Sequence, residues 1–290
     1  MPSVKKDTKR KKIKNRLRVG IALGGGSARG IAHIGILKAL KDHDIPIYCI
    51  SGTSAGAIIA AMYAFDVPLD TLTMRVKKLS WYSISELPRS KLGLVSNVAI
   101  KKIVEEIIGP VDINKSHCPL AIVATDIETG EKIVFHNGSV ALAVQASTCL
   151  PGLFTPVEID GRKLMDGGLA ENVPLEPLRK MGAEIVIGVD VAHWPSQKKV
   201  DNILDVISNT IDILINHQKI VRENFVDISI EPDLGMYNSS DFKKADEIVS
   251  AGYRAALRKI PEIRRLLKKK APQRKPKGLF VRFLDWLSGE

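Results

Sequence analysis

The chain has 290 residues, of which 45% are hydrophobic and 26% are charged, as in an ordinary folded globular protein. This length accommodates one large α/β domain with a continuous apolar core, and the composition excludes a chain that is disordered throughout. The formal net charge is +11, and the excess of basic residues lies within residues 5–18 and 264–277. We expect residues 1–17 to be a disordered basic segment, residues 18–260 to form the domain, and residues 261–290 to form a basic tail.

The sequence also indicates where the protein is located in the cell and what kinds of partner it binds. No secretory signal precedes Val19–Leu23, and glycine and serine interrupt the apolar stretch 47–65, so we expect a cytoplasmic protein without a membrane span. Cys49, Cys118 and Cys149 form no CxxC pair, which favours free thiols and gives no support to a zinc site. The basic ends are suited to contact with anionic lipid at the inner membrane surface. Nucleic acid is not expected, because aromatic residues are not interleaved with the charges.

Short β-rich runs alternate with longer helical stretches, which is the pattern of a mostly parallel sheet covered by helices. We expect strands, in chain order, at residues 18–23, 47–50, 120–125, 132–135, 185–189 and 227–230. We expect helices at residues 28–42, 55–65, 69–79, 97–108, 140–147, 175–181, 203–222 and 243–257.

Two segments allow two interpretations each. Residues 80–96 hold Trp81, Tyr82 and several leucines between polar residues, which fits a lid over an apolar substrate or a surface loop with anchoring aromatics. Residues 279–287 have the pattern of a short amphipathic helix behind a basic run. Such a helix either lies at a membrane interface or docks on the domain.

The most specific motif follows the second expected strand. Gly52-Thr53-Ser54-Ala55-Gly56 fits G-x-S-x-G, the nucleophile elbow. This turn is so tight that side chains at both glycine positions would clash, and it presents the serine hydroxyl at the carboxyl end of a strand. The following helix begins with free N–H groups and a positive dipole end. Ser54 is therefore the candidate nucleophile.

A second glycine-rich turn, Gly24-Gly25-Gly26-Ser27-Ala28-Arg29-Gly30, closes the first expected strand and opens a helix. Its N–H groups can converge on a phosphate or on a tetrahedral oxyanion. A P-loop needs Lys-Ser/Thr after its last glycine, and a dinucleotide-binding turn needs G-x-G-x-x-G. Neither pattern is present, so the oxyanion is favoured.

Arg29 lies in the first turn of that helix, where a cation opposes the helix dipole. One interpretation is an ordinary surface arginine. The other is a residue that holds the glycine turn or attracts a phosphorylated head group.

A serine hydroxyl is a weak nucleophile and needs a base. Asp166, in Asp166-Gly167-Gly168, is the candidate, because the paired glycines let the backbone turn sharply and present the carboxylate. Only His193 and His217 follow Asp166 in the chain, as the Ser…Asp…His order of α/β-hydrolases requires. His217 falls inside a helical pattern, so His193 is the one serious candidate for a triad.

Three blocks, Gly24–Gly30, Gly52–Gly56 and Asp166–Gly168, resemble in this order the signature blocks of the patatin-like phospholipase family, in its bacterial branch. Residues 124–131 and 146–157 resemble further stretches of that family. The similarity runs from about Arg18 to about Ile230 and so covers most of the chain. It implies a three-layer α/β/α domain with a mostly parallel central sheet.

The resemblance also implies a catalytic dyad. Ser54 would attack an ester carbonyl and Asp166 would take its proton directly, while the N–H groups of Gly25, Gly26 and Ser27 hold the oxyanion. Members hydrolyse acyl esters of phospholipids, lysophospholipids or neutral lipids through an acyl-enzyme, without metal or cofactor. This sequence has Asp-Gly-Gly where many members have Asp-Gly-Ala, and Gly168 keeps the backbone freedom that the turn needs.

Two alternatives stay open. An α/β-hydrolase with a Ser54–Asp166–His193 triad would lose its activity without His193, whereas a dyad enzyme would not. A non-catalytic lipid-binding or regulatory protein on the same fold would keep its role without Ser54. The intact glycine turn, nucleophile and base argue against this second alternative.

Overall fold

The computed structural model describes residues 17–80, 82–87, 91–192 and 225–270, together with residues 206, 209, 210, 213 and 214. The following expectations lie outside these described residues: the segment 1–16, most of the helix at 203–222, the helix at 279–287, and Trp81, His193 and His217.

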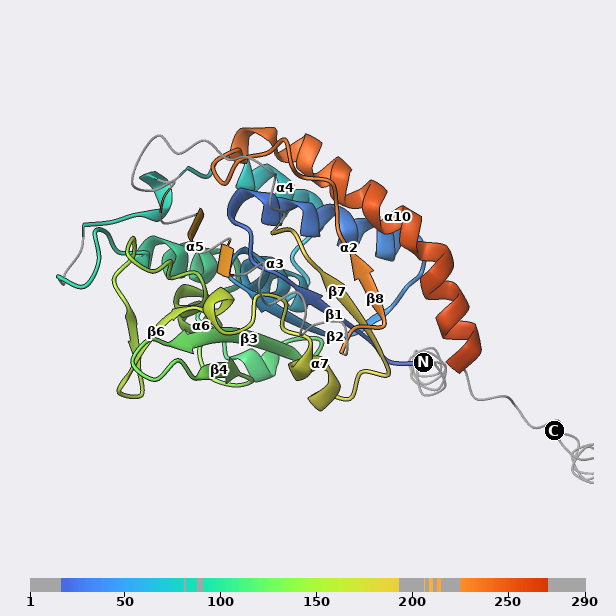
Figure 1. Ribbon diagram of the computed structural model, residues 1–290, viewed down its shortest axis with the longest axis horizontal. Helices are drawn as coiled ribbons and strands as arrows, with labels where there is room; N and C mark the ends of the chain where they lie inside the picture. Colours follow the sequence, from blue (N-terminus) through green and yellow to red (C-terminus); the bar gives the residue numbers. More distant parts are fainter. Residues whose placement is uncertain are drawn as a thin grey trace, which may run out of the picture.

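A sheet of eight strands forms the middle of the domain (Figure 1). Its strands are β1 (Val19–Leu23), β2 (Ile47–Thr53), β3 (Leu120–Asp126), β4 (Lys132–Phe135), β5 (Val157–Ile159), β6 (Arg162–Asp166), β7 (Ile185–Val189) and β8 (Ile228–Ile230). Strands β3, β2, β1, β7 and β8 are neighbours in this order and are parallel. Strands β4 and β6 pair antiparallel with β3, and β5 pairs antiparallel with β6. The expected mostly parallel central sheet is confirmed.

Helices cover both faces of this sheet. They are α2 (Ala32–Asp42), α3 (Ala55–Ala64), α4 (Leu69–Val76), α5 (Val98–Ile108), α6 (Val140–Ser147), α7 (Glu176–Lys180) and α10 (Ala245–Lys270), with short 3-10 segments η1 (Ser27–Ile31), η2 (Tyr82–Ile84), η3 (Ile113–Lys115), η4 (Gly167–Leu169) and η5 (Phe242–Lys244). Successive side chains of a strand point to opposite faces. Ile21 and Leu23 accordingly enter the large core with α2, α3 and α10, whereas Ala22 packs in a smaller cluster with Leu178 of α7.

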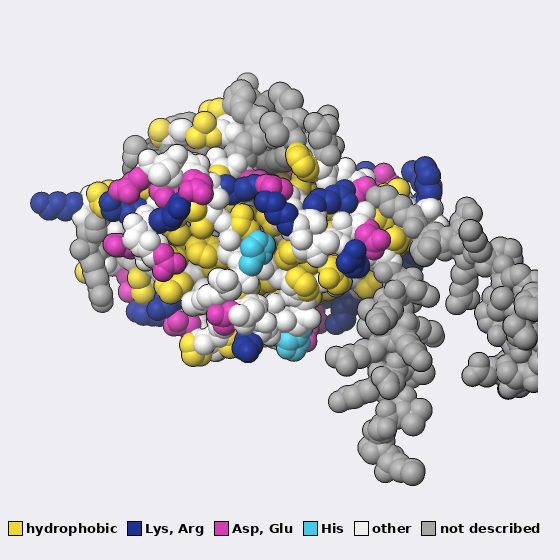
Figure 2. All heavy atoms as spheres, turned by 90° about the horizontal axis from the view of Figure 1, so that it is seen from below, with side chains coloured by type: hydrophobic (Ala, Val, Ile, Leu, Met, Phe, Trp, Pro, Cys, Tyr) yellow, Lys and Arg dark blue, Asp and Glu magenta, His cyan; other side chains and the backbone are white. Residues whose placement is uncertain are grey.

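The surface of the described domain carries mixed charges. On the face seen in Figure 2, Lys and Arg side chains are interspersed with Asp and Glu side chains. This pattern agrees with a sequence whose excess of basic residues is concentrated near its two ends.

Two strands were not expected from the sequence. The antiparallel hairpin of β5 and β6 joins through Asp160, which has a φ of 51°, and Gly161, which has a φ of 75°. β5 is only 3 residues long, and β6 begins with the charged pair Arg162 and Lys163. β5 alternates between apolar and polar residues but is shorter than the run of about four to eight residues that predicts a strand, and β6 does not alternate. β6 is stabilised by its pairing with β3, which is a long-range contact.

Two helices also differ from expectation. The helix expected at 28–42 begins as the 3-10 segment η1 and becomes α-helical only at Ala32. The helix expected at 243–257 continues to Lys270 and therefore passes residue 260, where the predicted domain ends. Pro261 lies inside it and removes one hydrogen-bond donor. Burial of Ile260 and Ile263, which are 3% and 0% exposed, stabilises the helix on both sides of that proline.

One edge of β3 receives two strands that run toward each other. Thr53, the last residue of β2, pairs with Val123, and Asp166, the last residue of β6, pairs with the next residue, Ala124. Both β3 residues also pair with β4, so β2 and β6 must share the opposite edge. The ends of two strands that lie far apart in the sequence thus meet at neighbouring positions.

α2 and α10 pack closely through glycine (Figure 1). A Cβ atom at Gly35 would lie 1.9 Å from the carbonyl oxygen of Val249, and one at Gly252 would lie 2.1 Å from that of Ala32. Even one methyl group therefore does not fit between these helices.

We expect Gly35→Ala and Gly252→Ala each to lower the free energy of unfolding by about 1–3 kcal/mol, because overpacking outweighs the gain in helix propensity. Chemical denaturation of the full chain measures this effect. Arg258→Ala, at an exposed position of α10, is the control and should change the free energy of unfolding by less than about 0.5 kcal/mol. A stabilising effect of either glycine replacement would contradict the observed packing.

Candidate active site

Ser54 occupies a strained turn between β2 and α3. Its φ of 53° and ψ of −125° lie in a region that L-residues rarely adopt. Its N–H donates to Ser147 Oγ at 2.9 Å, and that hydroxyl donates to the carbonyl oxygen of Val123 at 2.6 Å. Ser147, which was not predicted as a site residue, thus links the strained turn to β3.

The small residues around Ser54 are required by space. A Cβ atom at Gly52 would lie 2.5 Å from the carbonyl oxygen of Gly56, and one at Gly56 would lie 2.0 Å from that of Leu23. A Cβ atom at Gly30 would lie 2.5 Å from the Cβ atom of Ala55. The glycine turn after β1 is therefore packed directly against the turn that carries Ser54.

Asp166 is a buried carboxylate at the end of β6, and it is 3% exposed. Its Oδ1 accepts a hydrogen bond from the N–H of Gly168 at 2.8 Å, whereas Oδ2 is buried and has no hydrogen-bond partner among the described residues. Burial raises the pKa of Asp166 to about 6, against the opposing effects of the Ser54 hydroxyl and the Gly168 N–H. A Cβ atom at Gly167 would lie 2.2 Å from the carbonyl oxygen of Val123, so the chain must turn here without a side chain.

The glycine turn after β1 differs from expectation at Gly25. The N–H of Gly25 donates to the backbone oxygen of Asn172 at 3.3 Å and to its Oδ1 at 3.1 Å, so it is already engaged. The N–H groups of Gly26 and Ser27 make no hydrogen bond within the part of the chain that the structure describes. A Cβ atom at Gly25 would lie 3.0 Å from that of Ser54, so the turn is in contact with the candidate nucleophile.

Two buried side chains that were not predicted as site residues hold this turn. Asn172 binds Gly25 in both directions, because its Nδ2 also donates to the Gly25 carbonyl oxygen at 3.4 Å. His33 Nε2 lies 2.8 Å from the Gly24 carbonyl oxygen, and burial lowers the pKa of His33 to about 4. A neutral imidazole that contacts a carbonyl oxygen carries its proton on that nitrogen and donates it. Asn172 lies 147 positions from Gly25 in the sequence, and His33 lies on the next helix, α2. Neither residue belongs to a recognisable sequence motif, so local sequence does not predict these contacts.

Arg29 is 2% exposed, which excludes the interpretation as a surface arginine. It lies in η1 at the base of the glycine turn. His193 lies outside the described residues, but the chain approaches the site just before it. A Cβ atom at Gly26 would lie 2.7 Å from Cγ2 of Val191.

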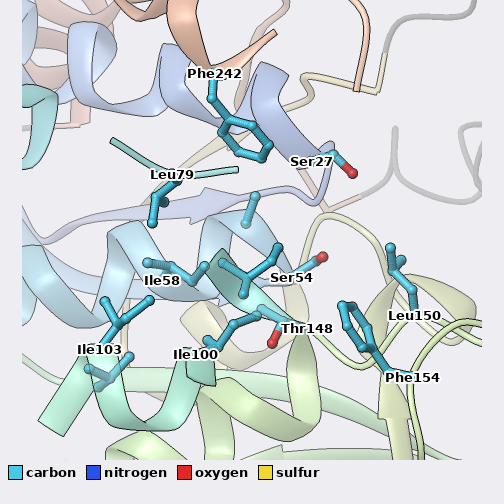
Figure 3. A pocket seen from close by; sticks show the side chains of 13 residues that line it. Ser27, Ser54, Ile58, Leu79, Ile100, Ile103, Thr148, Leu150, Phe154 and Phe242 are labelled. Atoms are coloured by element: carbon cyan, nitrogen blue, oxygen red, sulfur yellow. The ribbon is translucent and has the colours of Figure 1, made fainter. Parts of the chain in front are cut away.

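An apolar pocket of about 100 Å³ opens beside Ser54 (Figure 3). That volume is several times what one water molecule needs. Besides Ser27, Ser54 and Thr148, the lining is apolar and consists of Ala55, Ile58, Leu79, Ile84, Ile100, Ile103, Val104, Leu150, Phe154 and Phe242. Ile84 belongs to the segment 80–96, so part of that segment forms a wall of the pocket. A site of this shape and chemistry suits an acyl chain whose carbonyl lies at Ser54.

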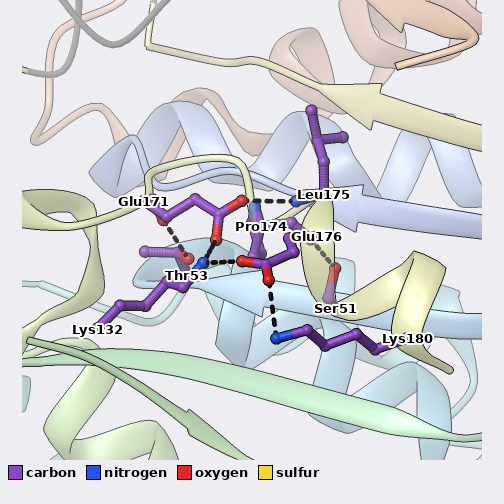
Figure 4. A network of polar contacts seen from close by, with 8 residues as sticks. All are labelled: Ser51, Thr53, Lys132, Glu171, Pro174, Leu175, Glu176 and Lys180. Atoms are coloured by element: carbon purple, nitrogen blue, oxygen red, sulfur yellow. Dashed lines mark hydrogen bonds and ion pairs between the residues drawn. The ribbon is translucent and has the colours of Figure 1, made fainter. Parts of the chain in front are cut away.

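A polar network joins Thr53 of β2 and Lys132 of β4 to residues 171–176, the segment that follows Asp166 and η4 (Figure 4). Thr53 Oγ1 donates to the backbone oxygen of Glu171 at 3.0 Å. Lys132 Nζ bridges the carboxylates of Glu171 and Glu176 at 2.9 and 2.5 Å. Hydrogen bonds from Lys132 first and then from Lys180 lower the pKa of Glu176 to about 2. The charges are thus paired with one another rather than with Asp166.

Other kinds of site find no support in the described part of the chain. No group of three His, Cys, Asp or Glu side chains there is placed to hold a metal ion. None of its helices is long and apolar enough to cross a membrane. Cys49, Cys118 and Cys149 are unpaired, and burial raises the pKa of Cys49 to about 12.

Comparison with known proteins agrees with this geometry. The sequence model of a family described as patatin-like phospholipase matches residues 21–179. An uncharacterized NTE family protein of Mycobacterium tuberculosis is 36% identical over 177 residues, which are 60% of this chain and 49% of that protein. Lysophospholipase NTE1 of Meyerozyma guilliermondii is 28% identical over 268 residues, with coverage of 81% of this chain and 19% of that protein.

Human patatin-like phospholipase domain-containing protein 6 is 28% identical over 269 residues, with coverage of 81% and 20% of the two chains. The chain thus spans about half, or less, of the length of these relatives. Among solved structures, VipD from Legionella pneumophila aligns with a TM-score of 0.48 at 14% identity, over 84% of this chain and 66% of that chain.

The raised pKa of Asp166 predicts a cost in stability that depends on pH. The folded protein holds the Asp166 proton up to about pH 6, whereas the unfolded chain releases it near pH 4, so stability falls as pH rises through this window. We expect Asp166→Asn to remove that fall. Its free energy of unfolding should exceed that of the wild type by up to about 3 kcal/mol above pH 6, with little difference below pH 4.

Denaturation over this pH range measures the difference. Asp160→Asn, in the exposed turn between β5 and β6, is the matched control and should leave the pH dependence unchanged. A difference between Asp166→Asn and wild type that does not vary with pH would show that Asp166 is not buried as a carboxylate.

Proposed function

Because the chain belongs to the patatin-like phospholipase family, we propose that it hydrolyses acyl esters of lipids, with Ser54 as nucleophile and Asp166 as general base. One observation carries the proposal. A strained serine at the end of an apolar pocket adjoins a buried carboxylate that has one oxygen without a hydrogen-bond partner among the described residues. A nucleophile and a base in this relation are the minimum that acyl transfer needs.

In the first step, Ser54 Oγ bonds to the ester carbonyl carbon and its proton passes to Asp166 Oδ2. The negative charge that forms on the carbonyl oxygen is held by N–H groups. We assign this role to Gly26 and Ser27, whose N–H groups have no hydrogen-bond partner in the described structure, and not to Gly25, whose N–H donates to Asn172. One such donor is typically worth about 3–4 kcal/mol of transition-state stabilisation.

The intermediate then expels the alcohol, which takes the proton from Asp166, and leaves the acyl group on Ser54. A water molecule then attacks the carbonyl carbon of this acyl-enzyme while Asp166 accepts a proton from it. The bond between the acyl group and Ser54 Oγ breaks, the proton passes from Asp166 to Ser54 Oγ, and the fatty acid is released. The pKa of about 6 makes Asp166 a stronger base than an exposed carboxylate while it remains ionised at neutral pH.

The substrate class follows from the pocket. Its apolar walls suit the part of one acyl chain next to an ester carbonyl at Ser54. Since one fungal relative is named a lysophospholipase, we propose lysophospholipids, with a single acyl chain, as the first substrates to test.

A fluorophosphonate ester probe tests the two catalytic residues. We expect Ser54→Ala to abolish labelling and Asp166→Asn to lower the rate of ester hydrolysis by at least about 10³-fold. Ser250→Ala is the matched control, because it removes a serine hydroxyl at an exposed position of α10, outside the pocket lining. It should be labelled like the wild type.

His193→Ala separates the dyad from a triad. With a dyad, this variant keeps labelling and hydrolysis within about tenfold of the wild type, since no proton passes through the imidazole. Loss of labelling in a His193→Ala protein that still folds would assign the mechanism to a triad.

The pKa of Asp166 sets the pH dependence of the reaction. Below about pH 6, we expect kcat/KM to rise about tenfold per pH unit, because only the ionised carboxylate accepts the Ser54 proton, and then to level off. Hydrolysis of a soluble short-chain ester gives this profile. A kcat/KM that does not change across pH 6 would rule out Asp166 as the base with this pKa.

A further inference from the structure

Three leucine side chains of the segment after η2 face solvent. Leu87 is 90% exposed, Leu92 is 59% exposed and Leu94 is 58% exposed. We call these three residues the leucine loop. Single exposed apolar side chains are ordinary, but several on one protruding segment mark a surface that meets an apolar partner.

Backbone contacts hold the leucine loop at the wall of the pocket. Glu86 and Ser96 exchange two backbone hydrogen bonds of 2.8 Å, which close the loop at its base. The N–H of Leu94 donates to the carbonyl oxygen of Leu153 at 3.0 Å, next to Phe154 of the pocket lining. In Figure 1 this segment projects away from the domain beyond α5 and β6.

Three lysines adjoin the pocket lining or the leucine loop in sequence. Lys78 precedes Leu79 of the pocket lining, Lys243 follows Phe242 of that lining, and Lys91 precedes Leu92. All three lysines are exposed, and none has an ion pair among the described residues. Two acidic residues nearby are already neutralised, since Glu86 pairs with Lys102 at 2.7 Å and Asp246 pairs with Lys77 at 2.6 Å.

We propose that the leucine loop inserts into the surface of an anionic phospholipid membrane, with Lys78, Lys91 and Lys243 facing its head groups. Exposed leucine beside unpaired lysine is complementary to acyl chains beneath a negatively charged surface. The pocket would then open toward the lipid, so that an acyl chain reaches Ser54 without crossing water. This last consequence rests on the proposed function, whereas insertion itself does not.

Vesicle binding of the full chain tests insertion without any enzymatic assay. We compare the wild type with Leu87→Ser/Leu92→Ser/Leu94→Ser on phosphatidylcholine vesicles that contain about 30 mol% phosphatidylglycerol, enough to make the surface anionic. At roughly 0.5 M salt, which screens the basic ends of the chain, the triple variant should bind at least about tenfold more weakly. Phe225→Ser replaces an apolar side chain that is 45% exposed, beside the opposite end of the sheet, and should bind like the wild type.

The lysines are tested separately. Lys78→Gln/Lys91→Gln/Lys243→Gln should bind the anionic vesicles about tenfold more weakly at low salt, and should bind pure phosphatidylcholine vesicles like the wild type. Equal binding of this variant and the wild type to anionic vesicles at low salt would remove the assignment of an anionic surface.

Depth of insertion gives an independent readout. An environment-sensitive fluorophore on Leu92→Cys should shift to the blue and be quenched by lipids that carry a quencher in their acyl chains, whereas one on Phe225→Cys should not. If vesicle-bound protein shows no quenching at residue 92, the proposal is overturned. It is also overturned if the triple leucine variant binds vesicles like the wild type, or if its only defect is the loss of a dimer in solution.

The outcome is distinct from that of the proposed function. The triple leucine variant should hydrolyse a soluble short-chain ester at the wild-type rate, because none of its residues lines the pocket. Loop-dependent vesicle binding by a chain that hydrolyses no ester would uphold the insertion and reject the hydrolase. Normal hydrolysis of vesicular lipid by the triple variant would uphold the hydrolase and reject the insertion.

Discussion

The site depends on a shared edge of β3, where β2 and β6 end against each other at Val123 and Ala124. Neither strand could extend further without displacing the other, so both chains must leave the sheet at this point. One leaves through the strained turn at Ser54, and the other leaves at Asp166. The carbonyl oxygen of Val123 constrains both turns. It accepts a hydrogen bond from the Ser147 hydroxyl, which binds the Ser54 turn, and it leaves no room for a Cβ atom at Gly167, in the turn after Asp166.

The close packing at this edge of β3 also shifts the pKa values of the buried groups. Burial disfavours charge in both titratable groups of the site, so that the pKa of His33 falls and the pKa of Asp166 rises. An arginine or lysine paired with Asp166 would lower its pKa and weaken it as a base, and no such ion pair is present among the described residues. The nearby cation Lys132 is bound instead by Glu171 and Glu176. The network thus holds the backbone of this segment without pairing a cation with Asp166.

The sequence predicts local features well and long-range contacts poorly. Ser54, Asp166 and the glycine turns follow from patterns within seven residues or fewer, and the strand bounds of β4 and β7 agree with those expected. The strand β6 depends on pairing with β3, and the roles of Ser147 and Asn172 depend on contacts with residues 93 and 147 positions away. The family resemblance implies that the N–H of Gly25 holds the oxyanion, whereas in the structure this N–H donates to Asn172, a contact that no local sequence pattern indicates. The helix expected at 243–257 continues to Lys270, because burial of the helix against the domain outweighs the cost of Pro261 in its interior.

The proposed reaction also sets requirements on the surface around the pocket. Acylation needs an ester carbonyl at Ser54 with its chain in an apolar pocket, whereas deacylation needs water at the same carbonyl. A pocket closed on all sides would serve the first step and prevent the second. In the proposed orientation, the pocket, whose wall includes Ile84, faces lipid beside the leucine loop and stays in contact with water on its other side. A membrane interface would meet both demands of the proposed reaction without movement of Ser54 and Asp166, which leave the sheet at turns packed against the carbonyl oxygen of Val123.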